Sequence, residues 1–267
     1  MLAAQRRAHI LAELEREGMV RVSGLRELLG VSDMTVRRDL TALEQQGIVE
    51  KVHGGAMMRA EPATSEPGFE AKSALRLAEK EAIAARAAEL VAPGSAIAIS
   101  AGTTTHHFAR HLVDFPGLTV VTNSVWVADV LHRSGKGNVS VLLTGGLRTP
   151  SDALVGPLAI AALSSLHLDA AFLGVHGMDA QAGFTTPNLL EAETNRAMIR
   201  SARRLVVLSD SSKWGTVGLS SMASLRDASV LVTDTELGFQ ARQTIAESVG
   251  QLVCVPVDSD GPAADLN

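Results

Sequence analysis

The feature that most constrains the fold is a regular alternation of short apolar runs and helical patterns over the last two thirds of the chain. The runs are rich in β-branched residues and lack polar alternation, which is typical of strands buried on both faces of a sheet. Strands that alternate with helices form parallel sheets covered by helices, so the pattern predicts a mostly parallel doubly wound α/β domain. The expected strands occupy residues 96–100, 118–122, 139–144, 170–174, 204–209, 229–233 and 251–257, and the expected helices 78–91, 103–113, 124–133, 156–166, 188–202 and 236–247.

Length and cysteine content set the broad class of the protein. A chain of 267 residues forms one large or two ordinary domains. The single cysteine, Cys254, excludes an internal disulfide and fits a reducing compartment. The N-terminus is charged and helix-periodic, unlike a signal peptide, and no apolar run approaches the roughly 20 residues of a membrane span. We therefore expect a cytoplasmic protein with no membrane partner.

Net charge is unevenly distributed along the chain. Residues 1–60 hold nine Lys and Arg against eight Asp and Glu, a net charge of +1. The remainder holds fifteen against twenty-one, which gives −6 and the total of −5. An acidic protein of this kind is no general polyanion binder, so any DNA contact depends on individually placed basic residues.

A change of composition marks a boundary between two parts of the chain. The stretch "MMRAEPATSEPGFEAK" is rich in Pro, Glu, Ser and Thr and has no apolar period, as in a linker. The predicted organisation is a DNA-binding domain at residues 1–57, a linker at 58–72, an α/β domain at 73–257 and a tail at 258–267.

Three helical patterns precede the predicted linker. Ile10, Leu11 and Leu14 share one face of the first. Ser23 is the expected cap of the second, which turns Leu25, Leu28 and Leu29 inward and ends at Gly30. The third is "VSDMTVRRDLTALEQQG", capped by Ser32. Two helices, a short glycine turn and a further helix form the helix-turn-helix pattern.

The third helix has one apolar stripe and one polar face. Val36, Leu40 and Leu43 lie within about 60° of one another at 100° per residue and form the buried stripe. The opposite face is suited to a DNA major groove, with arginine reading guanine and threonine packing on a thymine methyl group. A solvated surface helix in a small bundle explains the same pattern equally well. The expected DNA contacts of this helix are Ser32, Met34, Thr35, Arg37, Arg38 and Thr41.

The segment "GIVEKVHGGAMMR" favours the DNA-binding interpretation. Alternation through Ile48, Glu50 and Val52 followed by Gly54-Gly55 predicts a hairpin with a two-residue turn. A hairpin directly after a recognition helix is a wing. Lys51 and His53 are its candidate DNA contacts, although ordinary strand-edge polarity explains His53 equally well.

Small polar residues follow almost every expected strand. They occur in "SAGTTT", "TNS", "TGGLR", "GVHG", "SDSSK" and "TD". Ligands of open α/β sheets bind beyond the carboxyl ends of the strands, and helix N-termini favour anions. Ordinary helix capping is the alternative for the threonines and for Glu191, which follows Asn188 in a capping-box pattern. The predicted pocket has backbone N–H groups of Gly102, Thr103, Thr104 and Thr105 and cationic Arg148 and Lys213 for a phosphate, and Asn123, Ser124, Thr186 and Glu191 for sugar hydroxyls.

Two other patterns indicate chemistry only weakly. His107, His111 and Asp114 share a helix face, but they lack nearby supporting ligands and flank an apolar stripe, so no metal site is predicted. The stretch "SDSSK" has a serine and a lysine without the glycine elbow of serine hydrolases. A lysine that binds phosphate is the simpler explanation, and no cofactor is expected.

Both parts of the chain resemble one family. "VSDMTVRRDL" followed by "GIVEKVHGGA" resembles the DNA-binding signature of the DeoR family of bacterial transcription regulators. The blocks "AGTTT", "VVTNS", "TGGLR", "ALVGPLA", "GFTTPN", "RAMI" and "SDSSKWG" are similar to the sensor domain of that family. The resemblance implies a winged helix-turn-helix followed by a sensor domain similar in fold to ribose-5-phosphate isomerase and glucosamine-6-phosphate deaminase. It also implies a phosphorylated sugar or sugar derivative as effector.

Two positions depart from the family pattern. His176 stands where the isomerases have an acidic segment and where DeoR-family sensors often keep an acid. Ser100 stands where the family usually has Asp before the threonine block. Both positions belong to the predicted effector pocket, and each change removes a negative charge from it.

The predicted function is a DNA-binding repressor of a carbohydrate operon. A general base is needed for isomerisation, and its segment is absent, so the chain is not expected to be an enzyme. The alternative is a sugar-phosphate isomerase or deaminase with an accessory DNA-binding head. Expected partners are double-stranded operator DNA and the phosphorylated effector. Because operators are symmetric, we expect a homodimer or homotetramer.

Overall fold

The computed structural model describes residues 6–7, 9–11, 13–14, 18–45, 49–52, 54–58, 63–64, 68–73, 75–133 and 138–257. The chain divides into two compact units, Met1–Pro62 and Ala63–Asn267. Among the described helices, none combines the length and apolar character that a membrane crossing requires.

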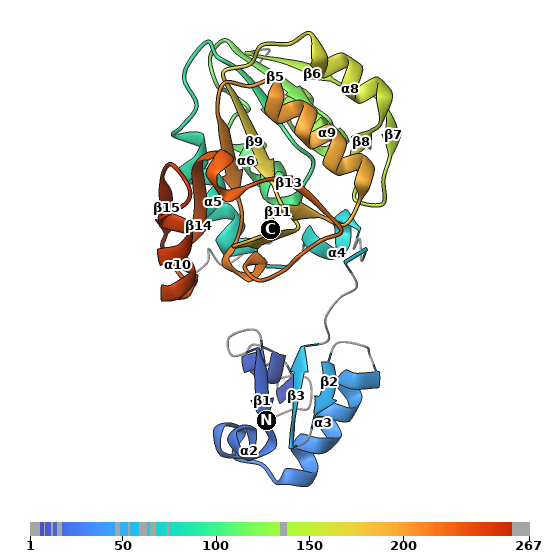
Figure 1. Ribbon diagram of the computed structural model, residues 1–267, viewed down its shortest axis with the longest axis vertical. Coiled ribbons are helices and arrows are strands. Elements are labelled where there is room, and N and C mark those ends of the chain that lie inside the picture. Colours follow the sequence, from blue (N-terminus) through green and yellow to red (C-terminus); the bar gives the residue numbers. More distant parts are fainter. Residues whose placement is uncertain are drawn as a thin grey trace, which may run out of the picture. The chain divides into compact units, whose positions relative to one another are not determined.

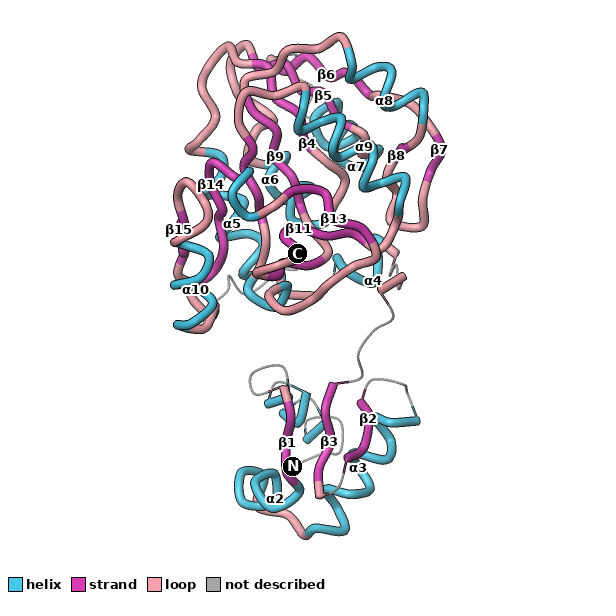
Figure 2. The backbone as a smooth tube through the Cα atoms, in the orientation of Figure 1, coloured by secondary structure: helices cyan, strands magenta, loops and turns pink. Residues whose placement is uncertain are grey.

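The first unit is a winged helix-turn-helix, as the sequence predicts. Its described elements are β1 (Met19–Arg21), α2 (Val22–Leu29), α3 (Asp33–Gln45), β2 (Val49–Val52) and β3 (Gly55–Met58). The strands form an antiparallel sheet in the order β1-β3-β2, visible in Figure 2. The core contains the predicted apolar residues of the first and third helical patterns, namely Ile10, Leu14, Val36, Leu40 and Leu43.

Two details of α2 differ from the prediction. The helix begins at Val22, with Arg21 as N-cap and no side-chain cap, so Ser23 lies inside the helix and does not cap it. Leu25 and Leu29 are buried, but Leu28 is exposed. The buried stripe of this helix is Val22, Leu25 and Leu29, and Val20 of β1, a strand that the sequence pattern did not indicate, belongs to the same core.

The turn of the wing lies one residue earlier than predicted. Val52 pairs with Gly55, so Gly55 belongs to β3 and is not a turn residue. Gly55 also pairs with Arg21 of β1. A Cβ atom at Gly55 would lie 2.0 Å from the carbonyl oxygen of Val20. The glycine is therefore required by the close approach of β1. His53 lies outside the described residues.

Replacing Gly55 with alanine is expected to destabilise the first unit by about 1–3 kcal/mol, because backbone atoms must shift to admit the methyl group. In hydrogen exchange of the full-length protein, β1 and β3 should lose protection while the second unit keeps its protection. Gly24→Ala is the matched control, since nothing lies within 4 Å of its added Cβ and alanine favours the helix. Equal protection in both variants would show that β1 tolerates the added Cβ.

The second unit contains the predicted parallel sheet. Within the described residues, seven parallel strands are arranged in the order β15-β14-β12-β9-β4-β5-β6. Each coincides with one of the predicted strands within one or two residues. They are β4 (Ala96–Ile99), β5 (Leu118–Thr122), β6 (Val139–Leu143), β9 (Ala170–Gly174), β12 (Leu205–Leu208), β14 (Ala228–Asp234) and β15 (Leu252–Val255).

Helices cover both faces of this sheet, which explains the uninterrupted apolar runs. One face packs against α5 (Leu77–Ala88), α6 (Thr103–Arg110) and α7 (Val125–Arg133). The other packs against α8 (Pro157–Ser164), α9 (Leu189–Arg200) and α10 (Phe239–Ala246), as Figure 1 shows for α5 and α9 on opposite sides. Neighbouring residues of one strand enter opposite cores, as Ala171 and Phe172 of β9 do. All six helices were predicted.

Smaller elements that the sequence analysis did not identify surround the carboxyl ends of the strands. A hairpin joins β7 (Leu147–Arg148) to β8 (Leu154–Val155). An antiparallel sheet joins β10 (Gly177–Asp179), β11 (Gly183–Thr186) and β13 (Ser220–Ala223). Of two short 3-10 helices, η1 (Ser211–Lys213) follows β12, and η2 (Leu225–Asp227) directly precedes β14 at its amino end.

The range predicted as linker contains a helix, α4 (Phe69–Ser73). Phe69 is buried and its ring stacks on Trp126 of α7 at a centroid distance of 5.1 Å. Ala63 accepts a backbone hydrogen bond from Leu219 at 2.9 Å. The described residues between 63 and 73 therefore belong to the second unit, and we refer to residues 63–73 as the connector segment.

Candidate functional site

The exposed face of α3 presents two arginines. Arg37 and Arg38 are exposed, and their guanidinium groups form no hydrogen bond or ion pair with the described part of the chain. Met34 beside them is 78% exposed. Ser32 caps the helix, since its Oγ accepts from the backbone N–H of Thr35 at 3.3 Å. The helix therefore offers a convex face with two unneutralised positive charges, as the sequence analysis expects of a recognition helix.

Thr41 and Lys51 contact each other. The Nζ of Lys51 on β2 donates to the Oγ1 of Thr41 at 2.7 Å and pairs with Glu44 at 2.8 Å. The Oγ1 of Thr41 donates to the carbonyl of Arg37 at 2.7 Å. In this structure both side chains attach the wing to α3, and a DNA role for either requires these contacts to be exchanged.

A buried ion pair holds α3 on its buried side. The carboxylate of Asp39 is buried and accepts from the Nε of Arg6 at 2.8 Å and from its Nη2 at 3.4 Å. Arg6 belongs to the first helical pattern. The pair joins the start of the chain to the recognition helix. Periodicity alone could not identify it, because the partners are 33 positions apart.

The loop from β4 into α6 has the geometry of an anion site. Gly102 adopts a φ of 155°, and a Cβ there would lie 3.0 Å from the Oγ1 of Thr105. The first N–H groups of a helix have no partner inside it. In the described part of the chain no acceptor faces the N–H groups of Thr103, Thr104 and Thr105. The hydroxyl of Thr105 donates to the carbonyl of Gly102 at 3.0 Å, so it stabilises the loop.

Two predicted ligands, Asn123 and Ser100, hold this loop in place, and a third, Ser124, caps α7. The Oδ1 of Asn123 accepts from the N–H of Ala101 at 2.8 Å, and its Nδ2 donates to the carbonyl of Leu154 at 3.2 Å. The Oγ of Ser100 accepts from the N–H of Gly174 at 3.0 Å. The Oγ of Ser124 accepts from the N–H of Val127 at 3.2 Å. All three are buried, so their observed contacts are structural.

A carboxylate surrounded by hydroxyl groups forms the second part of the site. Glu191 accepts hydrogen bonds from Thr149 at 3.0 Å, from Thr186 at 3.0 Å and from Ser151. Asn188 caps α9 through the N–H groups of Leu190 and Glu191, as predicted. The structure thus unites the predicted Thr186 and Glu191 with two hydroxyls of the β7–β8 hairpin. Thr149 and Ser151 were missed, because the segment "RTPSD" begins four residues after the end of the expected strand 139–144.

Arg148 lies on the same hairpin and is held by a carboxylate. Its Nε donates to the Oδ1 of Asp152 at 2.7 Å, and the Nε1 of Trp126 donates to the Oδ2 of Asp152 at 2.7 Å. The hydrogen bond from Arg148 holds the pKa of Asp152 below its ordinary value against the opposing effect of burial, and the Trp126 bond adds to it. Arg148 itself is 61% exposed at its side chain, so most of its guanidinium faces solvent.

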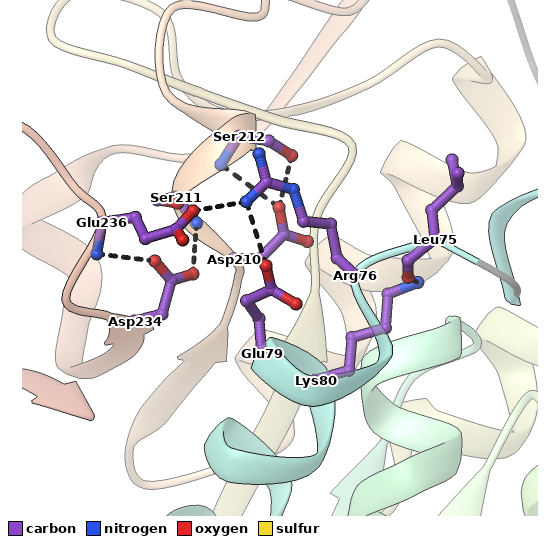
Figure 3. Close-up of polar contacts among 9 residues, drawn as sticks. All are labelled: Leu75, Arg76, Glu79, Lys80, Asp210, Ser211, Ser212, Asp234 and Glu236. Carbon is purple, nitrogen blue, oxygen red and sulfur yellow. Dashed lines mark hydrogen bonds and ion pairs between the residues drawn. The ribbon is translucent and has the colours of Figure 1, made fainter. Parts of the chain in front are cut away.

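Figure 3 shows a charged cluster beyond the ends of β12 and β14. The Nζ of Lys80 donates to the carbonyl oxygens of Lys72 and Leu75 at 2.5 Å each. Asp210 accepts from the N–H and hydroxyl of Ser212. Burial lowers the pKa of Lys80, Asp210 opposes this shift, and Lys213 adds to it. Lys80 of α5 therefore binds the end of α4 and the chain that follows it.

Lys213 follows β12 at the same edge as the Gly102 loop. Its ammonium has no hydrogen-bond or ion-pair partner in the described part of the chain. One strand, β9, separates β12 from β4. Neighbouring strands lie about 4.8 Å apart, so the two strand ends are about 10 Å apart. The hydroxyl of Ser212 donates to Asp210, and the Lys213 ammonium bonds to no serine hydroxyl among the described residues.

The histidines considered in the sequence analysis contact other parts of the second unit. The backbone N–H of His176 donates to the carbonyl of Thr185 at 3.1 Å. His107 and His111 contact Glu81 of α5 at 2.9 and 2.7 Å. Burial opposes the effect, but these hydrogen bonds hold the pKa of Glu81 below its ordinary value. Among the described residues, no group of three or more His, Cys, Asp and Glu has the arrangement of a metal site.

Comparisons with known families match both units. The DeoR-like helix-turn-helix domain matches residues 6–61. The DeoR C terminal sensor domain matches residues 76–235.

Curated relatives match almost the full length of the chain. The HTH-type transcriptional regulator GlpR of Haloferax volcanii is 37% identical over 95% of this chain and 98% of its own. The HTH-type transcriptional regulator FruR of Bacillus subtilis is 35% identical over 88% and 93%. The glycerol-3-phosphate regulon repressor of Escherichia coli is 30% identical over 94% and 99%.

Solved structures match more weakly. Ribose 5 phosphate isomerase A from Neisseria gonorrhoeae has a TM-score of 0.38 at 16% identity, over 51% of this chain and 53% of that chain. This likeness is too low to carry an argument about function.

Proposed function

Because this chain belongs to the DeoR family of DNA-binding transcriptional regulators, we propose that it represses a carbohydrate operon and responds to a phosphorylated sugar or sugar derivative. The effector would bind at the carboxyl edge of the sheet in the second unit. Its binding would change the affinity of the first unit for operator DNA. Two sites coupled in this way affect each other reciprocally, so operator DNA would change the effector affinity by the same factor.

The observation that carries the effector proposal is the pairing of two complementary features at one sheet edge. The N–H groups of Thr103 and Thr104 begin α6 without acceptors in the described part of the chain, and Lys213 nearby is an unpaired cation. Both suit a phosphate dianion. Glu191 accepts from three protein hydroxyls, which is the chemistry by which a carboxylate binds a sugar.

The names of the relatives favour the same class of regulon. One of them is a glycerol-3-phosphate regulon repressor, at 30% identity. We propose operator DNA as the macromolecular partner and a homodimer or homotetramer as the binding form, since a symmetric operator has two half-sites. Arg38 and Thr35 would contact bases and Arg37 a phosphate, with Lys51 and His53 of the wing beside them.

A thermal-shift screen of sugar phosphates tests the effector proposal. A ligand at one hundred times its dissociation constant adds about 2.7 kcal/mol to the free energy of unfolding, so the transition of the second unit should move upward. The parent sugars without phosphate are the control and should leave it unchanged. A shift produced equally by the parent sugars would contradict the phosphate site.

The alternative of an isomerase or deaminase predicts turnover. We expect none, because the position that would hold the acidic segment of the isomerases has His176. Turnover of a sugar phosphate that is lost in Glu191→Gln would establish the enzyme instead.

A further inference from the structure

The turn of the β7–β8 hairpin contains a residue in an unfavourable backbone conformation. Asp152 has a φ of 63°, in the left-handed region that favours glycine. Its N–H donates to the carbonyl of Thr149 at 3.0 Å, which closes the turn Thr149–Pro150–Ser151–Asp152. Glycine would satisfy this backbone position without strain, so an aspartate here points to a role for its side chain.

The Asp152 side chain joins two groups of different kinds. One oxygen accepts from Arg148, a predicted ligand of the effector phosphate, at 2.7 Å. The other accepts from Trp126 at 2.7 Å. The Asp152 side chain is only 17% exposed, whereas the Arg148 side chain that it binds is 61% exposed. A change at Arg148 therefore reaches the Trp126 indole through one carboxylate.

Trp126 in turn supports the connector segment. Phe69 of α4 stacks on the Trp126 indole with an interplanar angle of 11°, and its ring meets the edge of His106 at 5.6 Å. The chain just before α4 also lies close to the turn, since a Cβ added to Gly68 would be 3.5 Å from the carbonyl oxygen of Pro150. The connector segment is the part of the chain through which the second unit continues from the DNA-binding unit.

We propose that Asp152 is a positioning residue that links the effector site to the connector segment through Arg148, Trp126 and Phe69. The proposal rests on the proposed function, and it names the contacts by which effector binding would reach the DNA-binding unit. A phosphate bound at Arg148 competes with Asp152 for the guanidinium. Once Asp152 has lost Arg148, its hydrogen bond to the Trp126 indole changes. The position of the indole, on which Phe69 stacks, changes as a result. The same turn carries Thr149 and Ser151, so a ligand that replaces their bonds to Glu191 acts on Asp152 as well.

The first experiment needs no effector. In a full-length Trp214→Phe background, Trp126 is the only tryptophan, because the chain has two. Asp152→Asn removes the charge that holds Arg148 and weakens the acceptor of Trp126. In the Asp152→Asn variant we expect the fluorescence emission of Trp126 to move to longer wavelength and its quenching by acrylamide to rise severalfold. The matched control is Asp129→Asn, which breaks the exposed ion pair of Asp129 with Arg133 on the same helix. Equal spectra for the two variants would overturn the proposal.

The second experiment measures coupling in the same proteins. Operator affinity without effector should differ at least about threefold between Asp152→Asn and Asp129→Asn, within the range by which coupling residues act. Phe69→Leu, which removes the stacking partner and keeps an apolar side chain, should change the affinity in the same direction. Unchanged affinity in both variants, with an altered Trp126 spectrum, would show that Asp152 acts only on local structure and would overturn the proposal.

The third experiment separates this proposal from the proposed function. Inorganic phosphate, at matched ionic strength against chloride, should alter Trp126 emission in the Trp214→Phe protein and fail to do so after Arg148→Ala. A wild-type protein whose operator affinity responds to no sugar phosphate would refute the effector class. The effector-free comparisons of the first two experiments would still decide the role of Asp152.

Discussion

Replacing Arg38 with alanine is expected to lower the affinity for the specific operator by about 1–3 kcal/mol and to relax base preference at one position of each half-site. Arg38 is exposed on the face of α3 opposite the buried Val36, Leu40 and Leu43. It pairs with nothing in the described part of the chain, so its removal leaves no buried charge and the fold should persist.

The measurement is selection of binding sequences from a randomised duplex pool, followed by affinity at fixed salt. Arg133→Ala, which removes an exposed arginine of the second unit, is the control and should bind as wild type does. Arg37→Ala should weaken all sequences alike and reduce the salt slope by about 1 if Arg37 contacts a phosphate. Unchanged base preferences in Arg38→Ala would mean that another face of α3 enters the groove.

Replacing Lys213 with alanine is expected to disable the response to effector and to leave operator binding without effector nearly normal. A phosphate that loses a charged donor loses about 1.5–3 kcal/mol, so the effector concentration needed for the response should rise about 10- to 150-fold. A repressor of this kind would stay on its operator at effector concentrations that release the wild type.

The control for Lys213 is an exposed cation far from the proposed pocket. Arg203 lies just before β12, at the amino edge of the sheet, and its side chain is 83% exposed. Arg203→Ala should respond as the wild type does. A normal response in Lys213→Ala would place the effector phosphate elsewhere. Loss of operator binding in a folded Lys213→Ala would show that the lysine also affects the DNA-binding unit.

The strands of the parallel sheet and the longer helices were predictable because the burial of their side chains produces a recognisable pattern of apolar residues. A strand covered on both faces is apolar throughout, so all seven parallel strands could be located from their runs. The stripe of α3 was equally clear, since Val36, Leu40 and Leu43 face one core. Capping of α9 by Asn188 follows from local chemistry and was also confirmed.

The elements that were missed are those whose stability comes from distant partners. β1 has three residues and exists because β3 pairs with it. Gly55 looked like a turn residue because two adjacent glycines favour turns, and only the approach of Val20 shows why it lies in a strand. α4 lies in a segment rich in polar residues and is anchored by distant partners, through the ring contacts of Phe69 with Trp126 and His106.

The residues of the candidate site also fall into a part that the sequence predicts and a part that depends on distant partners. Strand ends identified the Gly102 loop, Lys213 and Glu191, because topology brings carboxyl ends of parallel strands to one edge. The network around Glu191 joins hydroxyls about 40 positions away, and no local pattern announces Thr149 or Ser151. Asp152 is visible only once its backbone conformation and its two partners are known.

The central claim is that a phosphorylated sugar controls operator binding, and the most direct test is operator affinity measured by fluorescence anisotropy with and without sugar phosphates. Salt must be fixed, because phosphate contacts make DNA affinity depend on it. We predict that at least one sugar phosphate changes the affinity of the wild-type protein by fivefold or more, on the order of 1 kcal/mol of coupling, while its parent sugar does not. Operator affinity that stays constant across the sugar phosphates that bind the protein would contradict this account.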